Sequence, residues 1–150
     1  MLKKTHFIIG IFIALYFLPY VNYKVVFFPV VLLASLIPDL DSFISSRNKY
    51  NTIKTIKSKI SKDFMHSYTL CVLISILLAF FYPILAFPFF LGYSFHLFLD
   101  SLTVEGISPF WPLKARTKGF ITFGGKTEKT IDVVFGIFIL LLILRYLFFF

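Results

Sequence analysis

The chain has 150 residues, of which 59% are hydrophobic, 22 are phenylalanine and only 15% are charged. A soluble domain of this size cannot bury so much apolar surface, and several apolar runs approach the roughly 20 residues that cross a bilayer. Composition therefore excludes a soluble protein and predicts an integral membrane protein; the net charge of +8 is typical of basic cytoplasmic loops that meet anionic lipids, so we expect no nucleic-acid partner.

Apolar segments predict an all-α membrane bundle of about five helices in a single domain, residues 1–150. In chain order they cover about residues 6–21, 25–44, 67–82, 84–102 and 130 to the C-terminus. Lys3 and Lys4 resemble the start of a signal peptide, but no small-residue cleavage motif follows, so we expect a retained helix. Pro83 predicts a break between the third and fourth helices. Several segments are short, so we expect tilt or partial insertion.

The basic residues predict how the chain is oriented in the membrane. Thirteen of the 15 Lys and Arg residues fall in regions that share one side, whereas the other side has Lys24 and Arg145. The positive-inside rule then predicts a cytoplasmic N-terminus and an outer C-terminus.

The basic linker at residues 47–63 spaces its isoleucines like one helical face. It predicts either an amphipathic helix on the membrane surface or a solvated loop.

The few His and Asp residues gather at segment ends that share the predicted cytoplasmic side. Charged groups in lipid are costly, so ionisable residues at this level favour a functional site. Helix ends on the opposite side carry none of these side chains. The residues concerned are His6, Asp39, Asp41, His66, His96 and Asp100.

Imidazole and carboxylate groups at one place predict a divalent metal site, with Zn²⁺ favoured and Mn²⁺ or Fe²⁺ as alternatives. His96 and Asp100 are four residues apart, so they share one helical face. Asp39 and Asp41 would diverge on a regular helix, but an extended backbone after Pro38 would direct both to one ion or to two adjacent ions. A zinc site with an open position activates water for hydrolysis, with Asp41 or Asp39 as the candidate general base.

Other charged residues are secondary candidates. Arg116, Lys118 and Lys62 would favour an anionic substrate, such as a phospholipid headgroup or another phosphoester. Glu128 is either a ligand or a carboxylate stabilised at a helix N-terminus. Glu105 precedes Gly106 in a predicted turn, where it is either a ligand or solvated.

Five short motifs together resemble the membrane-bound metal-dependent hydrolases, a family that includes SOS-regulated bacterial inner-membrane proteins. The motifs are His6 with Gly10, SLIPDLDS, His66 with Ser67, GYSFHLFLDSLTVEG followed by PFWPL, and GGKTE. They occur in the family's order along most of the chain, and the long motif is the specific one. The resemblance implies metal-dependent hydrolysis at the membrane, with membrane lipids as neighbours.

The chain departs from that family in the third motif, which usually reads His-Arg-x-x-Thr-His-Ser. Here the stretch is SKDFMHS, so Ser61 and Lys62 replace the His and Arg, and Met65 replaces the Thr.

Two alternatives to a hydrolase remain open on sequence alone. One is a membrane scaffold with a structural metal, and the other is a small ion or solute transporter.

Overall fold

The described part of the chain is helical throughout, apart from its connections. The computed structural model describes residues 3–39, 63–113 and 115–149. In chain order its helices are α1 (Lys3–Phe17), the 3₁₀ helix η1 (Leu18–Tyr20), α2 (Lys24–Leu36), the 3₁₀ helix η2 (Ile37–Asp39), α5 (Tyr68–Phe81), α6 (Pro83–Ser101) and α7 (Lys126–Phe149). A helical turn at residues 63–65 precedes α5. The predicted all-α fold is therefore confirmed.

Several helix boundaries differ from the sequence prediction, and α1, for example, begins at Lys3 and not near His6. α2 ends at Leu36 and passes into η2, so the chain leaves the regular helix before Asp39 and not near residue 44. α7 begins at Lys126, about four residues earlier than predicted, and Glu128 therefore lies in its first turn. The predicted surface helix at residues 47–63 falls almost wholly outside the described residues.

Proline and serine set the boundaries of α5 and α6. Pro83 is the first residue of α6, where its fixed φ fits a helix start and its missing N–H costs nothing. The preceding Tyr82 is non-helical, with φ −142° and ψ 70°, so α5 and α6 form the predicted hairpin. Ser67 caps α5, because its Oγ accepts the backbone N–H of Leu70 at 3.3 Å. This cap fixes the backbone directly after His66.

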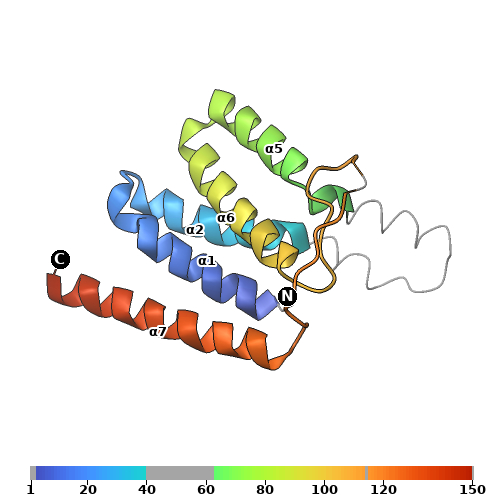
Figure 1. Ribbon diagram of the computed structural model, residues 1–150. Helices are drawn as coiled ribbons and strands as arrows, with labels where there is room; N and C mark the ends of the chain where they lie inside the picture. Colours follow the sequence, from blue (N-terminus) through green and yellow to red (C-terminus); the bar gives the residue numbers. More distant parts are fainter. Residues whose placement is uncertain (1–2, 40–62, 114, 150) are drawn as a thin grey trace, which may run out of the picture.

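α2 and α6 form the centre of the bundle (Figure 1). α1 packs on α2 and carries α7 on its far side, whereas α5 packs on α6. The buried apolar side chains of α1, α2 and α6 form one cluster: Ile9, Ile13, Ala14, Phe27, Val31, Leu91 and Leu99. A second cluster joins α2, α5 and α6, and consists of Ala34, Cys71, Phe89, Tyr93, Leu97 and Ile107.

α7 lies at the edge of the bundle and runs parallel to α1 (Figure 1). Thr5 contacts Glu128 near the start of both helices, and the Tyr146 hydroxyl donates to the Leu15 carbonyl at 2.8 Å near their ends. Between these points Phe12 packs edge-to-face on Phe135. The apolar window of α7 is otherwise unburied, as expected of a helix that faces lipid.

Two of the described helices, α6 and α7, are long and apolar enough to cross a bilayer, whereas α1 and α5 are shorter apolar helices. A hydrocarbon core of about 30 Å needs about 20 helical residues. α6 has 19 residues and α7 has 24. These two helices support a membrane location for the chain.

Glycines allow α1 and α6 to approach α2 closely around Ser35. A Cβ at Gly92 would lie 2.3 Å from the carbonyl oxygen of Val31, and a Cβ at Gly10 would lie 2.8 Å from the Ser35 Oγ. Each glycine is one turn from a histidine, Gly10 from His6 and Gly92 from His96. The close approach therefore brings both imidazoles against the same part of α2.

We predict that Gly92→Ala destabilises the protein by about 1–3 kcal/mol, because the added methyl group meets backbone and forces α2 and α6 apart. The matched control is Gly136→Ala on α7, where a Cβ would meet nothing within 4 Å. Thermal unfolding in detergent measures both variants. A Gly92→Ala protein that melts with the wild type would contradict the close packing of these two helices.

Candidate metal centre

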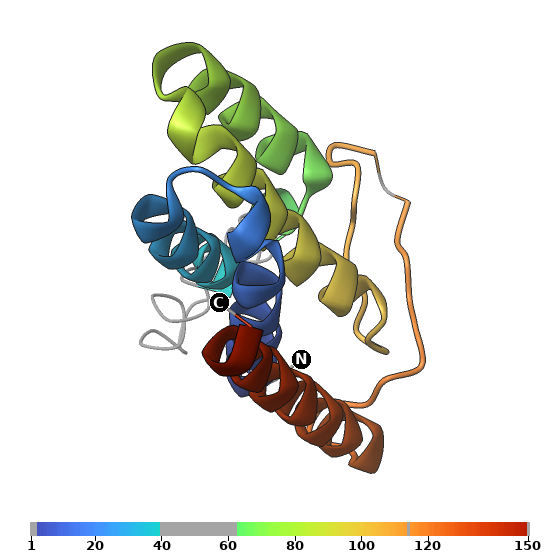
Figure 2. The ribbon, with the colours of Figure 1, turned by 90° about the vertical axis from the view of Figure 1, so that its left-hand side faces the viewer.

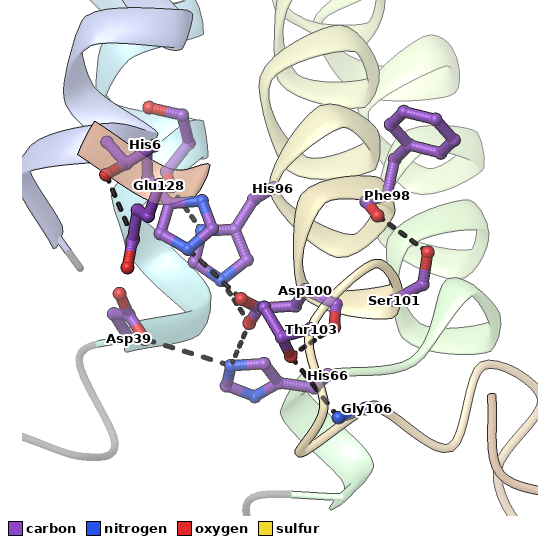
Figure 3. Close-up of polar contacts among 12 residues, drawn as sticks. His6, Asp39, His66, His96, Phe98, Asp100, Ser101, Thr103, Gly106 and Glu128 are labelled. Carbon is purple, nitrogen blue, oxygen red and sulfur yellow. Dashed lines mark hydrogen bonds and ion pairs between the residues drawn. The ribbon is translucent and has the colours of Figure 1, made fainter. Parts of the chain in front are cut away.

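Five of the six predicted ligands meet at one end of the bundle (Figure 3). α1 supplies His6, η2 supplies Asp39, and the residue before the α5 cap supplies His66. α6 supplies His96 and Asp100 from successive turns of one face. The sixth, Asp41, lies outside the described residues, so its place in the site stays a prediction.

Asp100 is the centre of this cluster. Its Oδ1 lies 3.1 Å from the Nε2 of His6. Its Oδ2 lies 3.3 Å from the Nε2 of His96 and 3.4 Å from the Nε2 of His66. Asp39 completes the group, with its Oδ1 3.8 Å from the same His66 nitrogen. One carboxylate thus faces three imidazoles that come from three different segments.

The cluster is removed from solvent. His6 and His96 are 1% exposed, His66 is 4% exposed and Asp100 is 9% exposed. The rings of His6 and His96 are stacked, with centroids 4.0 Å apart and planes at 20°, and His66 meets His96 edge-on. Stacked, buried imidazoles favour neutral rings, because two adjacent positive charges would repel in a medium of low dielectric.

The backbone of α2 selects the tautomer of His96. The Nδ1 of His96 lies 2.7 Å from the Ser35 carbonyl oxygen, which can only accept, so Nδ1 carries the proton and donates it. In the neutral ring, Nε2 then presents a lone pair. Within the described part of the chain this Nε2 makes no hydrogen bond, and it faces the Asp100 Oδ2. Two acceptors in this position require a proton or a cation between them.

His6 also keeps one ring nitrogen without a hydrogen bond. Its Nε2 contacts Asp100, while its Nδ1 is buried and has no hydrogen-bond partner among the residues the structure describes. Buried polar atoms normally have partners, and leaving one without a partner is costly. The arrangement is consistent with a site that another group completes.

The donor atoms form two overlapping groups of the size a metal ion needs. His6, His96 and Asp100 form one, and Asp39, His66 and His96 form the other; in each group the donor atoms lie within 4.8 Å of one another. His96 can offer only its Nε2, because Nδ1 is bound to Ser35. It can therefore serve one ion, and Asp100, with its two oxygens, is the side chain suited to bridge two.

The chemistry of these donors fits a borderline divalent cation. Imidazole nitrogen with carboxylate oxygen suits Zn²⁺, Mn²⁺ or Fe²⁺, and hydrogen bonding of the second ring nitrogen to a backbone carbonyl is the usual support for a ligating histidine. No sulfur belongs to either group among the described residues. Cys71 is buried elsewhere, with its Sγ 3.6 Å from the Ser94 Oγ.

Glu128 lies beside the cluster but belongs to neither group. It is fully buried. Its Oε1 accepts the Thr5 hydroxyl at 3.0 Å, and its Oε2 accepts the backbone N–H of Gly124 at 2.7 Å. Of its two predicted roles, the position in the first turn of α7 matches the helix-terminal carboxylate. Because Thr5 precedes His6, Glu128 ties the start of α7 to the turn that carries this histidine.

Two of the three predicted substrate-binding residues, Arg116 and Lys118, belong to the connection between α6 and α7. Arg116 and Lys118 are exposed, and Arg116 pairs with Asp63 at 3.7 Å. Glu105 is also exposed, next to Gly106 at φ 65°. Lys62 and Ser61 lie outside the described residues. Among the described residues the structure therefore brings five of the predicted metal ligands together, whereas the predicted substrate contacts stay predictions.

Three contributors to the site were not predicted. Ser35 acts through its backbone carbonyl, which no side-chain pattern reveals. Thr5 binds Glu128 across 123 residues of sequence. Thr103 donates its hydroxyl to the Asp100 carbonyl at 2.7 Å. In the sequence, only the position of Thr5 beside His6 and of Thr103 close to Asp100 indicates that these two residues belong to the site.

The fold and the cluster together define an α-helical membrane protein with a buried histidine–carboxylate centre. The family profile of the YdjM inner membrane proteins matches residues 1–149, so the chain belongs to the YdjM inner membrane protein family. Neither the search of curated proteins nor the search of solved structures gave a match. The family match supports a location in the inner membrane.

We predict that Glu128→Ala lowers the free energy of unfolding by about 1–3 kcal/mol, because it leaves the buried Thr5 hydroxyl and the Gly124 amide without their acceptor. Lys129→Ala, at the exposed neighbouring position, is the control and should melt like the wild type. Thermal unfolding in metal-free detergent solution measures the difference. Equal melting of Glu128→Ala and wild type would show that this carboxylate does not fasten α7 to α1.

Proposed function

We propose that the chain is a metal-dependent hydrolase of the inner membrane that acts on a phosphoester at the cytoplasmic face. The observation that carries the proposal is the contact between His96 and Asp100. The Ser35 carbonyl holds the proton of His96 on Nδ1, so the Nε2 lone pair faces the Asp100 Oδ2 at 3.3 Å in a buried site. A bound cation would satisfy both atoms.

His6, His96 and Asp100 would hold the ion, with Asp39 and His66 completing the coordination or holding a second ion. A divalent ion there would lower the pKa of a bound water and polarise the phosphoryl oxygen. Zn²⁺ is the favoured ion, with Mn²⁺ and Fe²⁺ as alternatives.

Asp39 is the described carboxylate best suited to accept a proton from an attacking water. Its side chain is 19% exposed, compared with 12% for Asp100, so water reaches it more readily. Its Oδ1 lies 3.8 Å from the Nε2 of His66, which can orient it. Asp41 remains the second candidate base from the sequence.

The orientation of the protein follows from charge in this proposal. The end of the bundle that carries the cluster also carries the exposed cations Arg116, Lys118, Lys126 and Lys129. The positive-inside rule assigns such an end to the cytoplasm. The N-terminus would then be cytoplasmic, the C-terminus outside, and the same cations would favour an anionic substrate.

A structural metal site in a membrane scaffold is the second candidate, and the burial of the cluster is the observation that favours it. His6 and His96 are each 1% exposed. A structural site is closed by protein ligands, whereas a catalytic one keeps a position open for water. Metal binding without hydrolysis would support the scaffold.

We predict that the purified protein binds at least about one equivalent of Zn²⁺ or Mn²⁺ per chain, and that His96→Ala/Asp100→Ala abolishes binding because both donors are removed. Ser101→Ala is the matched control, since its exposed hydroxyl donates only to the Phe98 carbonyl. Elemental mass spectrometry after dialysis measures the stoichiometry.

Hydrolysis of a panel of phosphoesters by the same three proteins tests the catalytic part of the proposal. The rate of hydrolysis by the double variant should fall by more than about 100-fold. The loss of an outer-shell hydrogen-bond partner alone typically lowers activity by roughly 10–100-fold, and the double variant lacks two direct donors. A folded wild type that takes up no metal after incubation with zinc and manganese would overturn the proposal.

A further inference from the structure

The connection between α6 and α7, residues 102–125, exposes large apolar side chains next to the cluster. We call it the α6–α7 loop. Five of its side chains are between 50% and 75% exposed: Val104, Phe110, Leu113, Phe120 and Phe123. Surface patches of this kind are rare in water and mark contacts with membranes or other molecules.

The exposure is not a consequence of an unstructured connection. The Val104 N–H donates to the Ile121 carbonyl at 3.0 Å, and the Gly119 N–H donates to the Thr103 carbonyl at 2.8 Å. Ile107 and Thr117 exchange two backbone hydrogen bonds. Ile107 and Ile121 are buried inside the loop. Ile107 belongs to the second apolar cluster of the bundle, so the loop is held against the helices while it presents phenylalanines outward.

The same surface is cationic. Arg116 and Lys118 are exposed within the loop, and Lys126 and Lys129 are exposed where α7 begins. Glu105 is the one exposed acidic residue in the described part of the loop. Apolar side chains combined with Lys and Arg are typical of surfaces that lie in the interface of an anionic bilayer.

Hydrogen bonds join the loop to the elements that carry the cluster. Thr103 donates to the Asp100 carbonyl at one end, and Gly124 donates to Glu128 at the other. In between, the Pro109 carbonyl accepts the N–H of Tyr68, two residues after His66. Figures 1 and 2 show the loop running outside the bundle from α6 to α7, beside the start of α5.

We propose that the α6–α7 loop inserts its exposed phenylalanines into the headgroup layer of an anionic leaflet, so that the substrate of the neighbouring site is a lipid phosphoester drawn from that leaflet. The loop joins the ends of α6 and α7, the two described helices of membrane length. Its level in the bilayer is therefore the interface. The substrate part of the proposal rests on the proposed hydrolase function, whereas the insertion does not.

Trp111 reports on this insertion directly, because it is the one tryptophan in the chain and lies in the loop. The metal-free protein is placed in nanodiscs of phosphatidylglycerol, with and without bromine on the upper acyl carbons. We expect brominated lipid to quench Trp111 strongly. Phe120→Ser/Phe123→Ser should lose most of that quenching.

Phe80→Ser/Phe81→Ser is the matched control, since these two phenylalanines are at least as exposed on average and lie at the opposite end of α5. It should keep the quenching of the wild type. Trp111 that brominated lipid leaves unquenched would overturn the insertion, whether acrylamide then reaches it from water or a second protein surface covers it.

The substrate is tested with a phosphoester lipid in phosphatidylglycerol vesicles and with its water-soluble headgroup ester. The Phe120→Ser/Phe123→Ser variant should lose activity on the lipid and retain activity on the soluble ester. Equal loss on both substrates, or no loss on the lipid, would overturn lipid delivery by the loop. Quenching without metal binding would uphold the insertion and reject the hydrolase, so the two failures can be told apart.

Discussion

The close approach of α1 and α6 to α2 around Ser35 is the constraint on which the candidate site depends. Gly10 and Gly92 permit it, because a Cβ at either position would meet Ser35 or the Val31 carbonyl. The approach brings the His96 Nδ1 within 2.7 Å of the Ser35 carbonyl and stacks His6 on His96. A carbonyl oxygen has two lone pairs, so the Ser35 carbonyl can accept the imidazole N–H and thereby position the side chain of His96. The orientation of the donors toward Asp100 follows from this packing.

The burial of the cluster makes its charged groups costly unless another charge compensates them. Three imidazoles and two carboxylates in contact, removed from water, would be costly if each stood alone, because charge in a medium of low dielectric needs compensation. In the proposed function a cation supplies it. The α6–α7 loop forms hydrogen bonds to Asp100, to Glu128 and to the start of α5. These bonds connect the proposed lipid-binding surface to the residues of the cluster.

Sequence alone predicted the helices and the grouping of five of the six candidate ligands, for physical reasons. Apolar runs with proline breaks define membrane helices, and His96 and Asp100 at one-turn spacing define a face. The contributions of Ser35 and of Thr5 could not be predicted, because one acts through its backbone and the other contacts Glu128 across 123 residues. The substrate contact of Arg116 stays a prediction, and its pairing with Asp63 could not be predicted from the sequence. Charge predicts which side of the membrane a residue occupies, but not which partner it selects.

The most direct test of the account is X-ray absorption at the zinc edge of the zinc-loaded protein. The account predicts nitrogen and oxygen ligands at about 2.0–2.1 Å, together with the outer-shell scattering of coordinated imidazole. A sulfur ligand near 2.3 Å, or a spectrum without imidazole scattering, would contradict it, because the ion would then lie away from His6, His96 and Asp100.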